Sequence, residues 1–293
     1  MLDRHTPAVP LTVGPPTRSK ANTVQAAAAR VLGETLTQFT DHLTALRGSD
    51  DPEVVHQARV AWRRFKSHLR LFEPALKLKS MPSLTPLQPL LKGLGALRDL
   101  DVALTETLPQ WRGTYMDGGL QTRAAQARRQ RDWRQMNQAL QCSAEAQRSV
   151  VRSELKQTNV VATLLALTAW VDGLSPATQG VAPATVPLRP WVRQRLAVWR
   201  SRFKKAIQSG RHSASPEQQH RARILAKQLR YGVEALGDWL PAQRSRRWRQ
   251  QAAQVQTKLG VARDLLQAHC LAAGVAADDD ILRFLQHLAA QSS

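Results

Sequence analysis

Apolar residues recur every three or four positions along most of the chain, a period that predicts helices. The first such segment starts near Asn22 and ends before Gly48. Asp51 and Pro52 then mark the start of a second helix, because proline is tolerated in the first turn. We expect this helix to stop at Pro74, since proline breaks a helix interior. No convincing run shows the period of two that is typical of strands, so the pattern predicts an all-α protein.

The same period predicts further helices between clusters of proline and glycine. They cover residues 87–108, 120–157, 159–172, 191–208 and 241–273. A further helix is expected to follow Ser215, its N-cap, and a last short helix is expected after Asp278. The apolar run at 160–171 is too short to span a bilayer, and we interpret it as a buried helix. Residues 1–21 are rich in proline and threonine and read as a disordered tail.

Two of these helices carry polar residues at the three-and-four spacing that usually marks an apolar face. We call these two sets the basic stripes. The first comprises His56, Arg59, Arg63, Lys66 and Arg70, and the second comprises His220, Arg223, Lys227 and Arg230. On a helix, each set lies along one side. A basic side that faces inward needs a counter-charge, and we interpret that counter-charge as a ligand.

The stripes belong to an internal repeat. The second stripe begins 220 − 56 = 164 residues after the first, and a Leu-Gly-x-x-Arg-Asp segment at 94–99 recurs at 259–264, a shift of 259 − 94 = 165. This repetition predicts two similar four-helix bundles related by a pseudo-twofold axis. We place the first half at about 22–173, a linker at 174–190 and the second half at about 191–290. If the bundles meet across the axis, the stripes face one another over a shared basic cleft or pore.

Each Leu-Gly-x-x-Arg-Asp segment has an expected structural role. We expect its glycine to allow the close approach of a neighbouring helix. The arginine and aspartate that follow are expected to orient the stripe residues through charge-assisted hydrogen bonds, so Asp99 and Asp264 are supporting residues. Tyr231, directly after Arg230, either offers its hydroxyl to a ligand or packs, and both roles stay open.

Net charge narrows the class of partner. Lys and Arg outnumber Asp and Glu by 42 − 22 = 20 in a chain of 293 residues, while the 43% of apolar residues is normal for a folded protein. Such a positive field favours polyanions or anionic membrane surfaces as partners. The two cysteines form no CxxC pair, which argues against a disulfide or zinc framework and fits a reducing cytoplasm. We expect no membrane span and no signal peptide.

With these residues in view, the chain resembles the conserved-histidine α-helical domain family, abbreviated CHAD. The resemblance rests on His56-x-x-Arg59-Val-x-x-Arg63-Arg64-Phe, on His220-x-x-Arg223-Ile-x-x-Lys227-x-Leu-Arg230-Tyr231, and on the two Leu-Gly-x-x-Arg-Asp segments. It covers roughly residues 22 to 290. It implies two pseudo-symmetric four-helix bundles around a basic pore that binds inorganic polyphosphate, and an association with polyphosphate granules. Lys66 and Gln228 depart from the family pattern, which puts ligand contact at Gln228 in doubt.

The candidate polyphosphate ligands are the stripe residues and nearby cations. They are His56, Arg59, Arg63, Arg64, Lys66, Arg70, His220, Arg223, Lys227, Arg230, Arg200 and Lys204. Arginine offers phosphate a planar pair of donors, while lysine acts as a point charge. The arginines of residues 120–157 are expected to form a solvated face, and the remaining histidines, including His68, to be structural. Because a bound polyanion favours protonated histidine, binding is expected to strengthen as the pH falls.

Two other functions compete with polyphosphate binding. A basic protein of this kind could bind nucleic acid, but no zinc-finger or homeodomain motif is present, and aromatic residues make up only 5% of the chain. An enzyme acting on polyphosphate would need a carboxylate-held metal or a phosphate-binding glycine loop, and neither pattern is found. We therefore expect a binding protein without catalytic residues, metal or cofactor.

Overall fold

A computed structural model describes residues 23–76, 80–118, 122–174, 186–212, 216–258 and 261–291. Within these ranges the chain is helical and contains no strand, apart from an isolated bridge between Thr23 and Pro187. The fold class is therefore all-α, as the period predicts. The main helices are α1 (Val24–Ala45), α2 (Pro52–Phe72), α3 (Gln88–Val102), α4 (Leu108–Asp117), α5 (Arg123–Glu154), α6 (Thr158–Asp172), α7 (Leu188–His212), α8 (Pro216–Leu236), α9 (Ala242–Lys258), α10 (Val261–Gly274) and α11 (Asp279–Gln291).

Capping residues account for the start of the first stripe helix. Asp51 is the N-cap of α2, and its Oδ1 accepts a hydrogen bond of 2.8 Å from the backbone N–H of Glu53. Pro52 occupies the first turn, and the helix ends at Phe72, before Pro74. Both ends agree with the prediction, because the cap satisfies a free N–H and the proline cannot continue the helix.

Four elements differ from the predicted pattern. The segment predicted as one helix at 241–273 consists of two, α9 and α10, and residues 259–260 between them lie outside the described residues. The third helix does not end at Leu108: a π-helical segment, Ala103–Thr107, connects α3 directly to α4. α6 is not buried, since Leu165 is 66% exposed and only one side of the helix faces the core. α7 continues through Gly210, because a glycine without a following proline does not force a helix to end. Ser215 lies outside the described residues.

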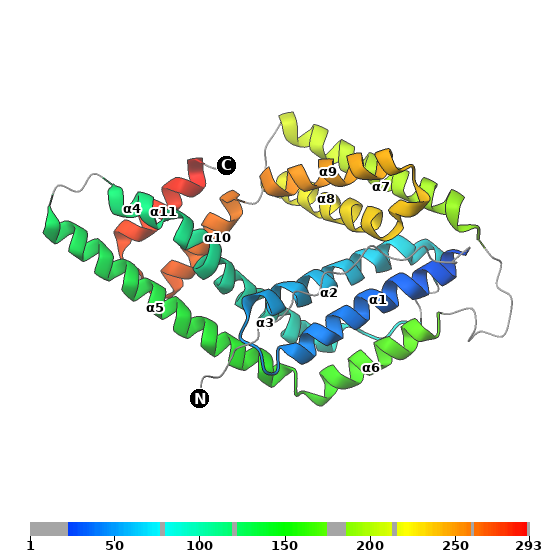
Figure 1. Cartoon of the computed structure of the whole chain (residues 1–293), viewed down its shortest axis with the longest axis horizontal. Coiled ribbons are helices and arrows are strands. Elements are labelled where there is room, and N and C mark those ends of the chain that lie inside the picture. Colours follow the sequence, from blue (N-terminus) through cyan, green and yellow to red (C-terminus); the bar gives the residue numbers. More distant parts are fainter. Residues whose placement is uncertain are drawn as a thin grey trace, which may run out of the picture.

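Two apolar cores hold the helices together. The first joins α1, α2, α3, α4, α5 and α6 with α10 and α11. The second joins α7, α8 and α9 with the start of α1 and the end of α2. In Figure 1, α7, α8 and α9 lie together above α1 and α2, whereas α10 and α11 lie beside α4 and α5. Apolar packing therefore crosses the expected boundary at residues 174–190. Residues 175–185 of this boundary lie outside the described residues, as do residues 1–22, which include the predicted tail.

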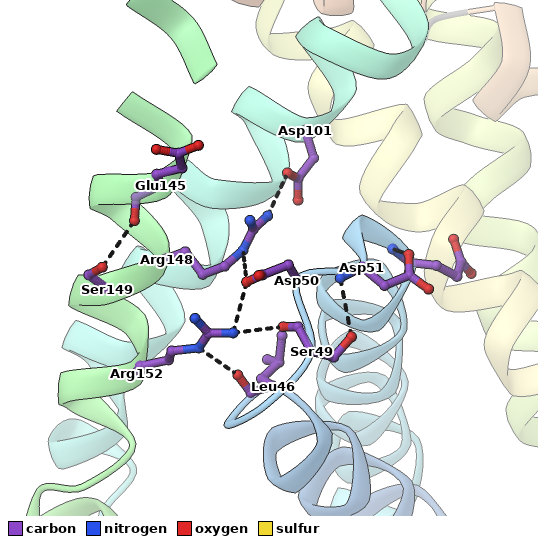
Figure 2. A network of polar contacts seen from close by, with 10 residues as sticks. Leu46, Ser49, Asp50, Asp51, Asp101, Glu145, Arg148, Ser149 and Arg152 are labelled. Carbon is purple, nitrogen blue, oxygen red and sulfur yellow. Dashed lines mark hydrogen bonds and ion pairs between the residues drawn. The ribbon is translucent and has the colours of Figure 1, made fainter. Parts of the chain in front are cut away.

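Arginines of α5 hold the turn before the first stripe (Figure 2). Arg152 donates to the backbone oxygens of Leu46 and Ser49, both at 3.1 Å, and pairs with Asp50 at 2.8 Å. Arg148 lies 3.6 Å from Asp50 and 3.5 Å from Asp101, whose side chain is 3% exposed. We expected the arginines of this helix to face solvent, and for these two that expectation is wrong.

The effect of these contacts is to anchor the start of α2. Burial raises the pKa of the Asp101 carboxyl, while the neighbouring Arg148 lowers it. The buried carboxylate and the turn therefore share one cationic partner on α5. Because the turn is held at both its carbonyls and its carboxylate, α2 begins at a defined position relative to α3 and α5.

None of the described helices combines the length and the apolar character that crossing a bilayer requires. Cys142 and Cys270 are exposed free thiols.

Candidate polyanion-binding site

The two stripe helices, α2 and α8, pack against each other (Figure 1). At their contact, Nη2 of Arg64 lies 3.5 Å from Oε2 of Glu234, and Nε2 of His68 lies 3.4 Å from the backbone oxygen of Tyr231. As the residue number rises along α2, it falls along α8. The two helices therefore cross in opposite directions, as two copies related by a twofold axis would.

Cations of both stripes act on one another across this crossing. The pKa of the Lys227 ammonium is lowered to about 8, first by burial and then by Arg63 of α2, by Arg223 and Arg230 of α8, and by Arg263 of α10. The same kind of effect extends to Arg59, whose pKa is lowered by burial and then by Arg63. We define the central basic cluster as Arg59, Arg63, Arg223, Lys227, Arg230 and Arg263.

Two aspartates balance part of this charge, one for each copy of the repeat. Burial is the main cause that lowers the pKa of the Arg59 and Arg223 guanidinium groups. Asp99 opposes this shift at Arg59, and Asp264 opposes it at Arg223. The pairing is the same in both copies, since each arginine and each aspartate lies at corresponding positions of the repeat. Each aspartate therefore acts electrostatically on the stripe arginine of its own copy, and its role as a supporting residue stays a prediction.

The cluster keeps an excess of positive charge. Its six cations face four carboxylates, Asp99, Asp264, Glu106 and Glu234. Of these, Glu106 is paired with Arg98 at 2.6 Å, and Glu234 lies 3.4 Å from Arg230 and 3.5 Å from Arg64, which is outside the cluster. The Nε of Arg63 is buried and has no hydrogen-bond partner within the described part of the chain. Buried donors are usually paired, so an unpaired one among like charges indicates a place for an anionic ligand.

Gly95 makes room for the Arg59 side chain. A Cβ atom at this position would lie only 2.9 Å from Nη1 of Arg59. We expected the glycine to admit a neighbouring helix, but it is a guanidinium group that uses the space. The corresponding Leu259 and Gly260 lie outside the described residues.

Gly95→Ala is expected to weaken ligand binding without loss of stability. The clash involves the free end of a flexible side chain, so Arg59 moves rather than the backbone. Alanine also favours a helix by about 1 kcal/mol over glycine, so the free energy of unfolding should stay unchanged or rise. We expect polyphosphate affinity to fall by roughly tenfold, about the contribution of one weakened hydrogen bond to a charged group. Denaturant unfolding and ligand titration measure the two effects.

Gly113→Ala provides the control, because Gly113 also lies in a helix and an added Cβ there meets nothing within 4 Å. The control should gain the same helix propensity and keep its affinity. Equal affinities of the two variants would contradict the role of Gly95 in placing Arg59.

Two of the predicted residues serve the helix crossing. Arg64 pairs with Glu234, which also lies 3.4 Å from Nε of Arg230. Tyr231 is 1% exposed, and its ring lies 5.8 Å from the guanidinium of Arg64 and 5.0 Å from that of Arg230. Of the two roles left open for Tyr231, packing between cations is the one that the structure favours. Both residues stabilise the site through cation–π contacts and charge pairing.

The remaining candidate ligands differ in how exposed they are and in what they contact. His56 is half-buried near the cluster, and its pKa is lowered by burial and then by Arg98. Four candidates are exposed: Lys66, Arg70, His220 and Lys204. Arg200 lies over the ring of Trp248, 5.1 Å from its centroid, and so packs on α9. His68 is buried with a pKa lowered to about 4 by burial, which agrees with a structural role.

Sequence reasoning underestimated Arg98 and Arg263. We treated both as groups that orient the stripes, but they contribute charge: Arg98 acts on His56, and Arg263 acts on Arg59, Arg223 and Lys227. The signal was available, since both occupy the same position of the repeated segment. The described residues contain no group of three or more His, Cys, Asp or Glu side chains that could hold a metal ion.

Comparison with known proteins places the chain in a family. The model of the CHAD domain matches residues 30–273, whereas no curated protein matches. The crystal structure of the CHAD domain from the plant Ricinus communis is similar with a TM-score of 0.77 and 23% identity, covering 97% of this chain and 91% of that one. PptA from Streptomyces chartreusis is similar with a TM-score of 0.53 and 18% identity, covering 93% and 94%. At these identities the two structures support the fold, and the family match shows that this chain belongs to the CHAD domain family.

Proposed function

We propose that the protein binds inorganic polyphosphate at the central basic cluster, in a cleft between two pseudo-twofold-related halves. The observation that carries the proposal is the meeting of the two stripes. Arg59 and Arg63 come from α2, Arg223 and Lys227 from α8, and the positive charge of Arg63 lowers the pKa values of Arg59, Arg223 and Lys227. Family membership supports the same ligand, as the resemblance implies.

The chemistry of the cluster suits a chain of phosphates. Polyphosphate carries negative charge along its length and offers no bases, so charge and phosphate geometry are all that a protein can recognise. Stripe residues three or four positions apart rise about 5 Å along the helix, which lets neighbouring side chains hold neighbouring phosphates. Arginines supply paired donors, and Lys227 supplies a point charge.

A competition experiment tests the ligand class. Purified protein is titrated with polyphosphates of defined length, and DNA is then added at equal phosphate concentration and physiological salt. We expect neither single- nor double-stranded DNA to displace long-chain polyphosphate. Displacement by either would favour the nucleic-acid alternative. Salt dependence alone does not discriminate, because both ligands release counterions on binding.

Affinity for polyphosphate is expected to increase as the pH falls from 9 to 7. In the free protein the pKa of Lys227 is lowered to about 8, so its ammonium is largely deprotonated at pH 9. A bound polyanion raises this pKa, and binding therefore takes up a proton in this interval. His56 extends the effect below pH 7, because its pKa is lowered in the free protein and a bound anion raises it.

Isothermal titration in two buffers of different ionisation enthalpy measures the proton uptake. Lys227→Gln should remove the dependence between pH 9 and 7 and leave the part at lower pH. Lys156→Gln, a change at an exposed position that follows α5 and belongs to neither basic stripe, is the control and should behave as the unchanged protein. If Lys227→Gln kept the full dependence, the titrating group would lie elsewhere.

We further infer that the protein acts by binding rather than by turnover, in the cytoplasm and at polyphosphate granules. The excess of cations over carboxylates at the cluster and the granule association implied by the family resemblance support this role. Incubation of polyphosphate with the protein and magnesium or manganese should leave the chain length unchanged. A fluorescently tagged protein should localise to granules. Release of phosphate would contradict binding without turnover, and a diffuse distribution would contradict the association with granules.

A further inference from the structure

A second basic surface lies on the hairpin of α7 and α8, away from the central cluster. A half-open groove of about 610 Å³ is lined by Arg202, Lys205 and Ala206 of α7 and by Gln218, Arg221 and Leu225 of α8. The lining residues follow the three-and-four helical spacing on both helices, so each helix contributes one wall. Arg202, Lys205 and Arg221 are exposed and bring positive charge to both walls.

The groove and the central cluster lie on different sides of α8. Arg221 of the groove and Arg223 of the cluster are two residues apart, which corresponds to about 200° around a helix. Leu225 lies a further two residues along, again about 200° from Arg223. A ligand in the groove therefore does not occupy the central cluster, and the two sites can be filled separately.

The charge of the groove is poorly balanced. No carboxylate lines it, and within the described part of the chain neither Arg202 nor Arg221 has an ion-pair partner. Arg202 also lowers the pKa of Arg195, one of its neighbours along α7. Positive charge therefore accumulates on this side of the hairpin, and an anion is the ligand that would relieve it.

We propose that this groove is a second binding site for polyphosphate, separate from the cleft. Arg202 and Lys205 lie about 4.5 Å apart along the axis of α7, which suits neighbouring phosphates, and Arg221 reaches the chain from the opposite wall. Among the described residues, no aromatic side chain lines the groove, so this part of it offers no stacking surface for nucleic-acid bases. The identity of the ligand rests on the proposed function. Two sites on opposite sides of α8 enable one molecule to hold two polyphosphate segments and so to cross-link chains.

Calorimetric titration with tripolyphosphate tests this second site. We expect the unchanged protein to show two classes of site, and the groove variant Arg202→Gln/Lys205→Gln/Arg221→Gln to lose one class by at least a tenfold fall in affinity. The matched control, Arg244→Gln/Arg246→Gln/Arg249→Gln, removes three exposed charges from α9 and should keep both classes. Arg59→Ala/Arg223→Ala should lose the other class and retain the groove.

The outcomes separate this inference from the proposed function. If the protein shows a single class of site, and this class disappears with Arg59→Ala/Arg223→Ala, the proposed site in the groove is wrong and the proposed site at the central basic cluster stands. No binding of tripolyphosphate or of longer polyphosphate overturns both. Equal losses of affinity in the groove variant and in the α9 control would show a general effect of net charge and contradict a specific site in the groove. Displacement of groove-bound tripolyphosphate by oligothymidine would also contradict a polyphosphate site there.

Discussion

Replacing both stripe arginines, Arg59→Ala with Arg223→Ala, should lower the affinity for long-chain polyphosphate by about 100-fold or more. A hydrogen bond to a charged group contributes about 1.5–3 kcal/mol, and a loss of about 1.4 kcal/mol is tenfold in affinity. The two arginines occupy equivalent places of the repeat and come from the two helices that cross. Their joint removal therefore takes charge from both helices of the central basic cluster.

The fold should tolerate this double change. Burial and neighbouring cations lower the pKa of both arginines, which means that their charged forms are disfavoured in the free protein. We therefore expect little loss of thermal stability. Arg244→Ala with Arg246→Ala removes the same charge from the exposed side of α9 and serves as the control. If the double variant and this control bound polyphosphate equally well, the stripes would not form the site.

Lys227→Glu should weaken binding at the central basic cluster and stabilise the free protein. Lys227 is surrounded by Arg63, Arg223, Arg230 and Arg263, all of which lower its pKa. A carboxylate at this position turns these repulsions into attractions, so the midpoint of thermal unfolding should rise by several degrees. The same carboxylate repels phosphate and occupies the cations that would bind it, so affinity should fall by about 100-fold or more.

This opposite change of stability and affinity distinguishes a ligand site from a structural cluster. Lys227→Met removes the charge without reversing it and should give intermediate values of both quantities. Lys156→Glu makes the same charge change at an exposed position after α5 and should alter neither by a comparable amount. A protein that lost stability with Lys227→Glu would need Lys227 for its fold, which would contradict the assignment. Differential scanning fluorimetry with and without polyphosphate measures both effects.

Local patterns were sufficient to place most of the helices. Asp51 and Pro52 predicted the start of α2 correctly because caps and first-turn prolines act within a few residues. Local patterns were insufficient where the surrounding elements determine the end of a helix or the burial of its side chains. Gly210 appeared to end α7 but does not, and the apolar residues of α6 appeared buried although Leu165 is largely exposed. Burial depends on which elements surround a helix, and a single segment does not contain that information.

The sequence alone determined that this chain is helical and that it carries two basic stripes at corresponding places of a repeat, because helical period and residue spacing are local properties. Only the tertiary structure decided which basic residues act together. Arg63 lowers the pKa of Lys227 across the crossing of α2 and α8, whereas Lys66 remains exposed and Arg64 pairs with Glu234. All of these side chains have similar chemistry. Their roles differ because the direction in which two helices cross determines which charges are buried together, and long-range packing sets that direction.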